Sequence, residues 1–297
     1  AQRDRPFSFP APNCPNPTGV SDGALLLAVG FLTGVLAGLL GAGGGFATVV
    51  LLLAAGADPQ VAVGTSLVYL MVMGGWGTFV HLRLGSADRR LVVAIGVAAA
   101  VGAVAGAEVA EALGDRDLTL ALGLFTACVA GVSLAWPQAR RPLTVPLAPP
   151  LEVAAEGVEM VEAEPEPAPQ IDLGRGELTG AVAGGGVIGV LKGVFGVGAG
   201  FLIVPVMVSV GRIPRPLAVT SSLFAILVAS LAGSLLHLFL GNIDWGGLAW
   251  LVPGGLFGSF VGARAARSMS PAAIRRLFLA AMASSSIYLI ALASSYK

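Results

Sequence analysis

The sequence has 297 residues, of which 56% are hydrophobic and only 11% are charged, and its formal net charge is +0. Soluble domains carry about 25% charged residues, so this composition excludes an ordinary soluble protein. The neutral balance also excludes the broad basic surface that binds nucleic acid.

The chain begins with a proline-rich segment, residues 1–21, which we expect to form an extramembrane tail because it lacks a continuous apolar run. Most of the apolar stretches that follow reach the ~20 residues that a membrane-spanning helix needs. Backbone polar groups find no water in hydrocarbon, and the stretches do not alternate as barrel strands do, so they are predicted to be α-helices. They lie at about residues 22–42, 44–56, 60–82, 90–113, 117–136, 177–196, 199–211, 215–240, 245–266 and 271–293.

Two of the apolar stretches are short. Phe46–Gly56 and Phe201–Gly211 would each extend about 16 Å as a helix, half of a ~30 Å hydrocarbon core. Each follows a cluster of glycines. We therefore expect glycine-broken helices or re-entrant pairs at these points.

A different composition marks residues 137–176, where prolines alternate with six glutamates. Such a segment favours a solvated connector. It divides the chain into a first transmembrane repeat at 22–136 and a second at 177–297.

The two hydrophobic units are similar to each other. Gly34–Phe46 matches Gly189–Phe201, so residue 34 corresponds to residue 189, an offset of 155. Farther along, residue 81 corresponds to residue 237, an offset of 156, which aligns His81 with His237 and Asp88 with Asp244. Chance similarity of apolar segments does not align His and Asp in this way, so the sequence predicts an internal repeat.

Arginine placement predicts the orientation. With five hydrophobic segments in each unit, the loops at 83–90, 137–176, 212–215 and 264–276 share one side and hold twelve arginines. The positive-inside rule makes that side cytoplasmic, which places both termini outside and the acidic linker inside. An odd number of segments makes the two repeats inverted, an architecture typical of transporters with a site at the repeat interface.

Each unit carries a glycine cluster, GLLGAGGGF at 38–46 and GVFGVGAGFLIVP at 193–205, followed by AVGTSL and AVTSSL. With these motifs the chain resembles the sulfite exporter TauE/SafE family of bacterial membrane proteins. The resemblance implies an exporter of sulfite or a related sulfur-containing or organic anion in the bacterial cytoplasmic (inner) membrane. The chain departs from the family pattern where Ala42 and Ala199 interrupt the glycine runs and where Lys192 replaces a small or polar residue.

The glycine clusters also suggest a binding site on physical grounds. Glycine permits the turn that ends one helix and starts a short one, and the N-terminus of a helix binds anions. Inverted repeats would bring two such ends together from opposite sides. The alternative is that these glycines only allow tight packing, which is the role we predict for the GxxxG series around Gly34, Gly189 and Gly258. The candidate binding residues in the clusters are Gly41, Gly43, Gly44, Gly45, Gly196, Gly198, Ala199 and Gly200.

Lys192 lies inside an apolar run, four residues before Gly196. An ammonium there costs about 2.5–3.5 kcal/mol on insertion scales, and no acid lies within a helical turn of it. A bound anion would offset that cost, whereas the alternative is a side chain that reaches a nearby interface. We expect Lys192 to attract the substrate.

Further polar residues occupy matching points of the two units. The hydroxyls of Thr65, Ser66, Thr220, Ser221 and Ser222 can donate to an anion or bind the backbone of their own helices. His81 and His237 lie close to helix ends and are candidates for proton coupling, although interfacial histidines are common.

The sequence contains no recurring set of nucleophile, base and acid, no metal-ligand spacing and no ATPase motif. It therefore predicts neither an enzyme nor a cofactor, but an all-α secondary transporter that moves a small anion across the lipid bilayer by alternating access, with protons as a candidate coupling ion. One alternative is an uptake carrier or channel for another small solute. Another is a non-transporting membrane module that docks a partner through its acidic linker. The sequence makes no prediction of oligomeric state.

Overall fold

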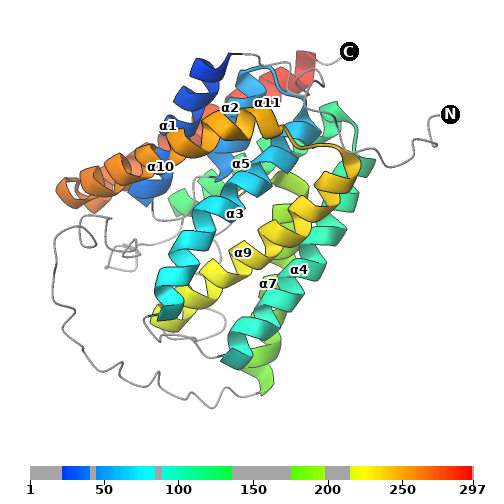
Figure 1. Ribbon diagram of the computed structural model, residues 1–297, viewed down its shortest axis with the longest axis vertical. Helices are drawn as coiled ribbons and strands as arrows, with labels where there is room; N and C mark the ends of the chain where they lie inside the picture. The colour runs from blue at the N-terminus through cyan, green and yellow to red at the C-terminus, as the bar shows by residue number, and fades with distance from the viewer. Residues whose placement is uncertain (1–21, 41–44, 84–88, 136–174, 198–214, 296–297) are drawn as a thin grey trace.

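The computed structural model describes residues 22–40, 45–83, 89–135, 175–197 and 215–295, and the regular elements in these ranges are all α-helices (Figure 1). The predicted tail and most of the predicted linker lie outside the described residues. The helices are α1 (Gly23–Leu40), α2 (Gly45–Ala54), α3 (Pro59–Arg83), α4 (Arg89–Ala112), α5 (Asp115–Ala135), α7 (Arg175–Phe195), α9 (Arg215–Leu240), α10 (Trp245–Ser268) and α11 (Pro271–Ser295).

Helix length and composition confirm an all-α, multi-pass membrane protein. Among the described residues, α4, α5, α9, α10 and α11 each contain a segment long and apolar enough to cross a membrane. Large apolar side chains also cover the outside of these helices, and Ile287 and Leu134 are 71% and 69% exposed. Water would not favour such a surface, but lipid does. The apolar part of α2 is only ten residues long, as the short stretch after the first glycine cluster predicts.

Glycine ends three of the helices. Gly56, Gly196 and Gly241 follow α2, α7 and α9 and have φ angles of 96°, 63° and 79°. This left-handed conformation is one that side chains with a Cβ rarely adopt, so glycine is favoured just after a helix. Gly196 is thus the point where α7 stops, as its place in the second glycine cluster predicts.

Capping residues fix the starts of α10 and α11. The Oδ1 of Asp244 accepts a hydrogen bond from the backbone N–H of Gly247 at 2.8 Å, and the Oγ of Ser270 accepts one from Ala273 at 3.2 Å. These bonds satisfy N–H groups that the first turn of a helix leaves unpaired. Pro59 and Pro271 occupy the first position of α3 and α11. A backbone N–H at this position has no partner within the helix, so the missing N–H of proline costs no hydrogen bond.

Two seams of close backbone contact join the repeats. A Cβ built on Gly34 of α1 would meet the backbone carbonyl of Gly255 in α10, and one built on Gly189 of α7 would meet the carbonyl of Ala99 in α4. Only glycine lets two helix backbones approach so closely. The packing role that the GxxxG series predicts is therefore confirmed.

The seams are equivalent contacts in the two repeats. At the offsets of 155 and 156, Gly34 corresponds to Gly189 and Gly255 corresponds to Ala99. The first helix of each repeat thus packs against the fourth helix of the other, as α1 with α10 and as α7 with α4. This exchange of partners shows that the repeats share one architecture and interlock.

The helices α3 and α9 run antiparallel between the seams and lie side by side, with α4 next to α9 (Figure 1). Gly64 contacts His237, Gly233 contacts Leu67, and farther along α3 Gly74 approaches Ile226. Residue numbers rise on one helix as they fall on the other, which fixes the register of the pair. These contacts place the beginning of α3 beside the end of α9.

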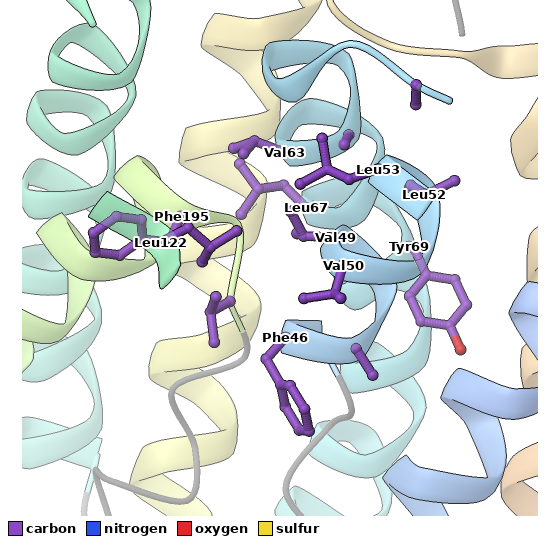
Figure 2. Packing of buried hydrophobic residues seen from close by; sticks show 14 of the residues in the cluster. Phe46, Val49, Val50, Leu52, Leu53, Val63, Leu67, Tyr69, Leu122 and Phe195 are labelled. Carbon is purple, nitrogen blue, oxygen red and sulfur yellow. The ribbon is translucent and has the colours of Figure 1, made fainter. Parts of the chain in front are cut away.

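An apolar cluster surrounds the beginning of α3. Figure 2 shows Val49 and Leu53 of α2 close to Val63 of α3, with Phe46 farther down α2 and Phe195 of α7 on the other side. The ring of Phe195 stacks on Phe125 of α5, with a centroid distance of 4.8 Å. The cluster therefore holds the end of α7 against α3.

Candidate functional site

One turn of α3, residues 63–67, contacts the second repeat on three sides; we call it the α3 turn. Val63 and Ser66 lie against Gly196 at the end of α7. Gly64 lies against His237 and the backbone carbonyl of Asn242, just after α9. The α3 turn thus brings together candidate residues that are about 130 or more positions apart in the sequence.

The two hydroxyls of the α3 turn bind backbone groups. The Oγ of Ser66 lies 2.7 Å from the carbonyl oxygen of Val63 and 3.0 Å from that of Gly196, and donates to both. The Oγ1 of Thr65 accepts a hydrogen bond from the N–H of Asp244 at 3.0 Å. In this conformation Thr65 and Ser66 therefore hold the ends of α7 and α10 in place, and only the bond of Ser66 to Val63 lies within their own helix. A role toward an anion stays a prediction.

Lys192 is fully buried in the last turn of α7. Its Nζ has no hydrogen-bond partner among the described residues, and its carbonyl accepts the N–H of Gly196 at 2.8 Å. Lys192 lies four residues before Gly196, the residue just after α7 that packs against Val63 and Ser66 of the α3 turn. The side chain does not reach an interface, and its charge lacks a protein counterpart in the described part of the chain.

His237 is also fully buried, in the last turn of α9. Both of its ring nitrogens lack a hydrogen-bond partner within the described ranges. Its side chain rests on Gly64, where a Cβ would come within 3.0 Å of the Cβ of His237. The absence of a side chain at Gly64 therefore makes the room for the imidazole.

Ser221 and Ser222 lie at the opposite end of the α3–α9 pair. The register places Ser222 opposite residue 78 or so, twelve residues beyond Ser66, or about 18 Å along α3. Both serines are buried, and the Oγ of Ser221 has no partner in the described part of the chain. The structure therefore separates the candidate hydroxyls into two groups at two levels.

Several predicted site residues lie outside the described residues, and the convergence of the two glycine-capped short helices stays a prediction. Gly45 begins α2 and is buried. The side chains of His81 and Thr220 are not among those that the structure describes. The glycine-cluster positions outside the described residues are Gly41, Gly43, Gly44, Gly198, Ala199 and Gly200.

A polar contact between α1 and α3 was not predicted from the sequence. The Oη of Tyr69 and the Oγ1 of Thr33 lie 3.1 Å apart, and Thr33 also donates to the carbonyl of Gly30 at 2.8 Å. Figure 2 shows the Tyr69 hydroxyl pointing away from the apolar cluster toward α1. Single hydroxyls 36 positions apart in apolar helices carry no pattern that would have linked them.

The charged groups near the α3 turn are few. Asp244 is buried as the N-cap of α10, and the Oε2 of Glu111 in α4 accepts a hydrogen bond from Asn242 at 3.1 Å. In the part of the chain that the structure describes, no three His, Cys, Asp or Glu side chains gather where they could hold a metal ion. A buried lysine and a buried histidine, both unpaired, are the features that set this region apart chemically.

Comparison with known proteins gives one family match over most of the chain. The family described as "Sulfite exporter TauE/SafE" matches residues 26–289. The chain is also similar to the probable membrane transporter protein YunE of Bacillus subtilis (strain 168), with 28% identity over 253 residues, or 82% of this chain and 89% of that protein.

Two further relatives have related names. A probable membrane transporter protein of Xylella fastidiosa (strain 9a5c) is 29% identical over 269 residues, which cover 88% of this chain and 92% of that protein. The probable membrane transporter protein MamO of Paramagnetospirillum magneticum is 28% identical over 205 residues, only 31% of its own length. No solved structure gives a significant match.

Proposed function

Because the chain belongs to the sulfite exporter TauE/SafE family, we propose that it is a secondary transporter that exports sulfite, or a related small sulfur-containing or organic anion, by alternating access. The chain is a multi-pass membrane protein of a transporter family, and its relatives bear names of membrane transporters. The substrate, the mechanism and the direction of transport are the proposed part.

The main support for an anionic substrate is Lys192, whose side chain is buried and unpaired among the described residues. A charged group in an apolar interior costs several kcal/mol unless it is paired, and protein acids do not pair with Lys192 among the described residues. An anion bound beside the α3 turn would offset this cost. The site would then have Lys192 as its charge and Ser66 as the residue that keeps the end of α7 in position.

The exchange of helices between the repeats supports alternating access. Transporters built from inverted repeats change state when one set of helices moves relative to the other around a fixed site. Here α1–α10 and α7–α4 form two equivalent seams on either side of the α3–α9 pair. We propose that the repeats are inverted across the membrane and that the seams move as units.

The proposed location is the bacterial cytoplasmic membrane, with both termini outside and the acidic linker in the cytoplasm. The twelve arginines on one set of loops support this orientation. Alkaline phosphatase fused after Lys297 would be active if the C-terminus lies outside. An inactive fusion of a correctly inserted protein would reverse the orientation.

Flux of sulfite into proteoliposomes tests the proposed function. Purified protein is reconstituted, and radiolabelled sulfite uptake is measured with sulfate, thiosulfate, acetate and lactate as competitors. We expect saturable sulfite movement in the wild type and at least about a tenfold loss in Lys192→Ala, equivalent to about 1.4 kcal/mol. Lys192→Arg keeps the charge and should retain part of the flux.

Ile188→Ala is the matched control, because Ile188 is buried on the same face of α7, one turn before Lys192. It makes a comparable cavity without removing a charge, so flux should stay near the wild-type level. Equal losses in the two variants would assign Lys192 a packing role. Absence of flux for every anion tested, from a folded preparation, would contradict the proposed anion transport.

Cells that accumulate more sulfite when they produce the protein would favour uptake over export.

A further inference from the structure

His237, in the last turn of α9, is a second buried group whose hydrogen-bonding atoms have no partner among the described residues. A neutral imidazole has one N–H donor and one acceptor nitrogen, and leaving each unpaired in an apolar interior costs about 1–3 kcal/mol. Both nitrogens are unpaired within the described ranges although the side chain is fully buried. This arrangement is favourable only when something other than the described side chains binds there.

The local packing leaves room for this histidine. Gly64 leaves space for the ring of His237, and a Cβ at this position would also meet the carbonyl of Asn242. The residue that corresponds to Gly64 is Thr220, which has a Cβ, and it is the position that His81 would face if the repeats packed alike. From the sequence correspondence alone, we therefore do not expect the same room beside the histidine of the first repeat.

Contacts with α4 place His237 and Lys192 in the same region. A Cβ built on Gly193, next to Lys192, would meet the carbonyl of Ala103, and one built on Gly233, one turn before His237, would lie 3.8 Å from the Cβ of Ala103. His237 of α9 and Gly196, just after α7, also contact the α3 turn. Lys192 and His237 thus belong to segments of α7 and α9 that both pack on α4 at Ala103.

The acidic groups around this region are already engaged. From α10, Asp244 accepts from Gly247 and is the cap of its helix. From α4, Glu111 accepts from Asn242 near the end of α9. The α3 turn contributes no titratable side chain, and α7 contributes Lys192. Neither carboxylate is hydrogen-bonded to His237 or Lys192.

We propose that His237 takes up one proton each time the site binds its anion, so that the ligand is an oxyanion held between two positive groups, Lys192 and the imidazolium of His237. This inference rests on the proposed anion site. Without an anion, two positive charges in one apolar region repel each other, and the imidazole stays neutral. A bound oxyanion reverses the balance, because it attracts both cations and accepts their hydrogen bonds.

Thermodynamic linkage then gives the pH dependence. If anion binding brings in a proton, protonation must strengthen anion binding by the same factor. The affinity should rise as the pH falls, by up to about tenfold per pH unit while the empty site is neutral and the occupied site is protonated. If the proton crosses the membrane together with the anion, an inward proton gradient opposes export, so the proposed export would be driven by the outward gradient of the anion itself.

Calorimetry tests the proposal without measuring transport. Sulfite, or the competitor that the flux assay ranks highest, is titrated into detergent-solubilised protein at one pH in two buffers with different heats of ionisation. The ligand's own protonation is the same for every variant, so differences between variants report on the protein. The wild type should take up about one more proton per anion than His237→Gln. Ser234→Ala, which removes a buried hydroxyl of α9 one turn before His237, is the control and should behave like the wild type.

Equal proton uptake by the wild type and His237→Gln, with the anion bound in both, would overturn the proposal. If His237→Gln does not bind the anion, His237→Lys decides, because a fixed charge should restore binding with the additional proton uptake abolished. Failure of His237→Lys to bind, or proton uptake equal to the wild type, would count against the role of His237. By contrast, a wild type that binds no anion, or binds it equally well after Lys192→Ala, would contradict the proposed function itself.

Discussion

The two repeats agree at their seams and differ at their centre. The contact of Gly34 with Gly255 recurs as the contact of Gly189 with Ala99, and the same helix positions meet in both seams. Around α3 and α9, by contrast, the side chains at equivalent positions are unlike. Lys192 corresponds to Ala37, and Gly64 corresponds to Thr220.

A second central difference is the polar contact between α1 and α3. Tyr69 and Thr33 correspond to Ala225 and Ile188, which cannot form a hydrogen bond between their side chains. The shared seams therefore make a common framework, and the residues that differ give the two halves separate tasks. One half carries the buried cation, and the other carries the polar link between α3 and α1.

Replacing a seam glycine should have the largest effect on stability. In Gly34→Val or Gly189→Val, the new side chain would meet a backbone carbonyl of the neighbouring helix, which cannot move aside as a flexible side chain would. We expect each variant to lose at least about 3 kcal/mol, the upper end of the range for overpacked cores. Thermal unfolding in detergent, followed by circular dichroism, measures the loss.

Gly131→Val is the control for the seam variants. A Cβ at Gly131 in α5 would find no atom within 4 Å, so only the helix propensity changes. The two seam variants should lose similar amounts. A large loss in one and a small loss in the other would show that the seams are not equivalent in energy, although their contacts correspond.

The seams were the part of the fold that the sequence predicted best. Glycines repeated every four residues in two units, with an offset that aligned His and Asp, were sufficient to predict both the packing role and the repeat. The packing of the helices around α3 could not be predicted in this way. They are apolar on every side, so the pattern does not say which face meets which neighbour.

The site was predicted in part for the same reason. Lys192 could be singled out because a charge in an apolar run is costly wherever the helix packs. The contact of Gly196 with Ser66, and that of His237 with Gly64, depend on how far α3 and α9 slide along each other. Only the packed structure fixes that register, and it also places Ser222 at the other end of the pair.

Removing the Tyr69 hydroxyl should have an intermediate effect. Tyr69→Phe keeps the ring that packs against Gly255 and deletes the bond with Thr33, while Thr33 retains its bond to Gly30. A typical hydrogen bond contributes about 1 kcal/mol, and we expect a loss of that size. Tyr69→Phe, Thr33→Val and the double variant form a cycle in which the coupling energy should be about 0.5–1.5 kcal/mol.

Tyr288→Phe provides the matched control, because Tyr288 is partly exposed on α11 and the same atom is deleted. Its stability should stay within about 0.5 kcal/mol of the wild type. Additive losses in the cycle would mean that the hydroxyls of Tyr69 and Thr33 do not support each other. The link between α1 and α3 would then not distinguish the two halves energetically.

The smallest effect on stability is expected for Ser221→Ala, and it is the most informative about function. Ser221 corresponds to Thr65, whose hydroxyl holds the N–H of Asp244, yet the Oγ of Ser221 has no partner in the described part of the chain. Deleting an unpaired buried hydroxyl should change stability by less than about 0.5 kcal/mol. Ser286→Ala, which removes a buried bond to Gly123, should cost about 1 kcal/mol in the same assay.

Measuring sulfite flux alongside stability then decides whether Ser221 holds backbone, as Thr65 does, or binds the substrate. A loss near 1 kcal/mol would mean that Ser221 holds backbone as Thr65 does, and that the two halves are more alike at this point than the described contacts indicate. Unchanged stability with reduced flux would instead assign the hydroxyl to the substrate. The anion would in that case pass two polar levels about 18 Å apart along α3, with Lys192 and His237 at one and Ser221 at the other.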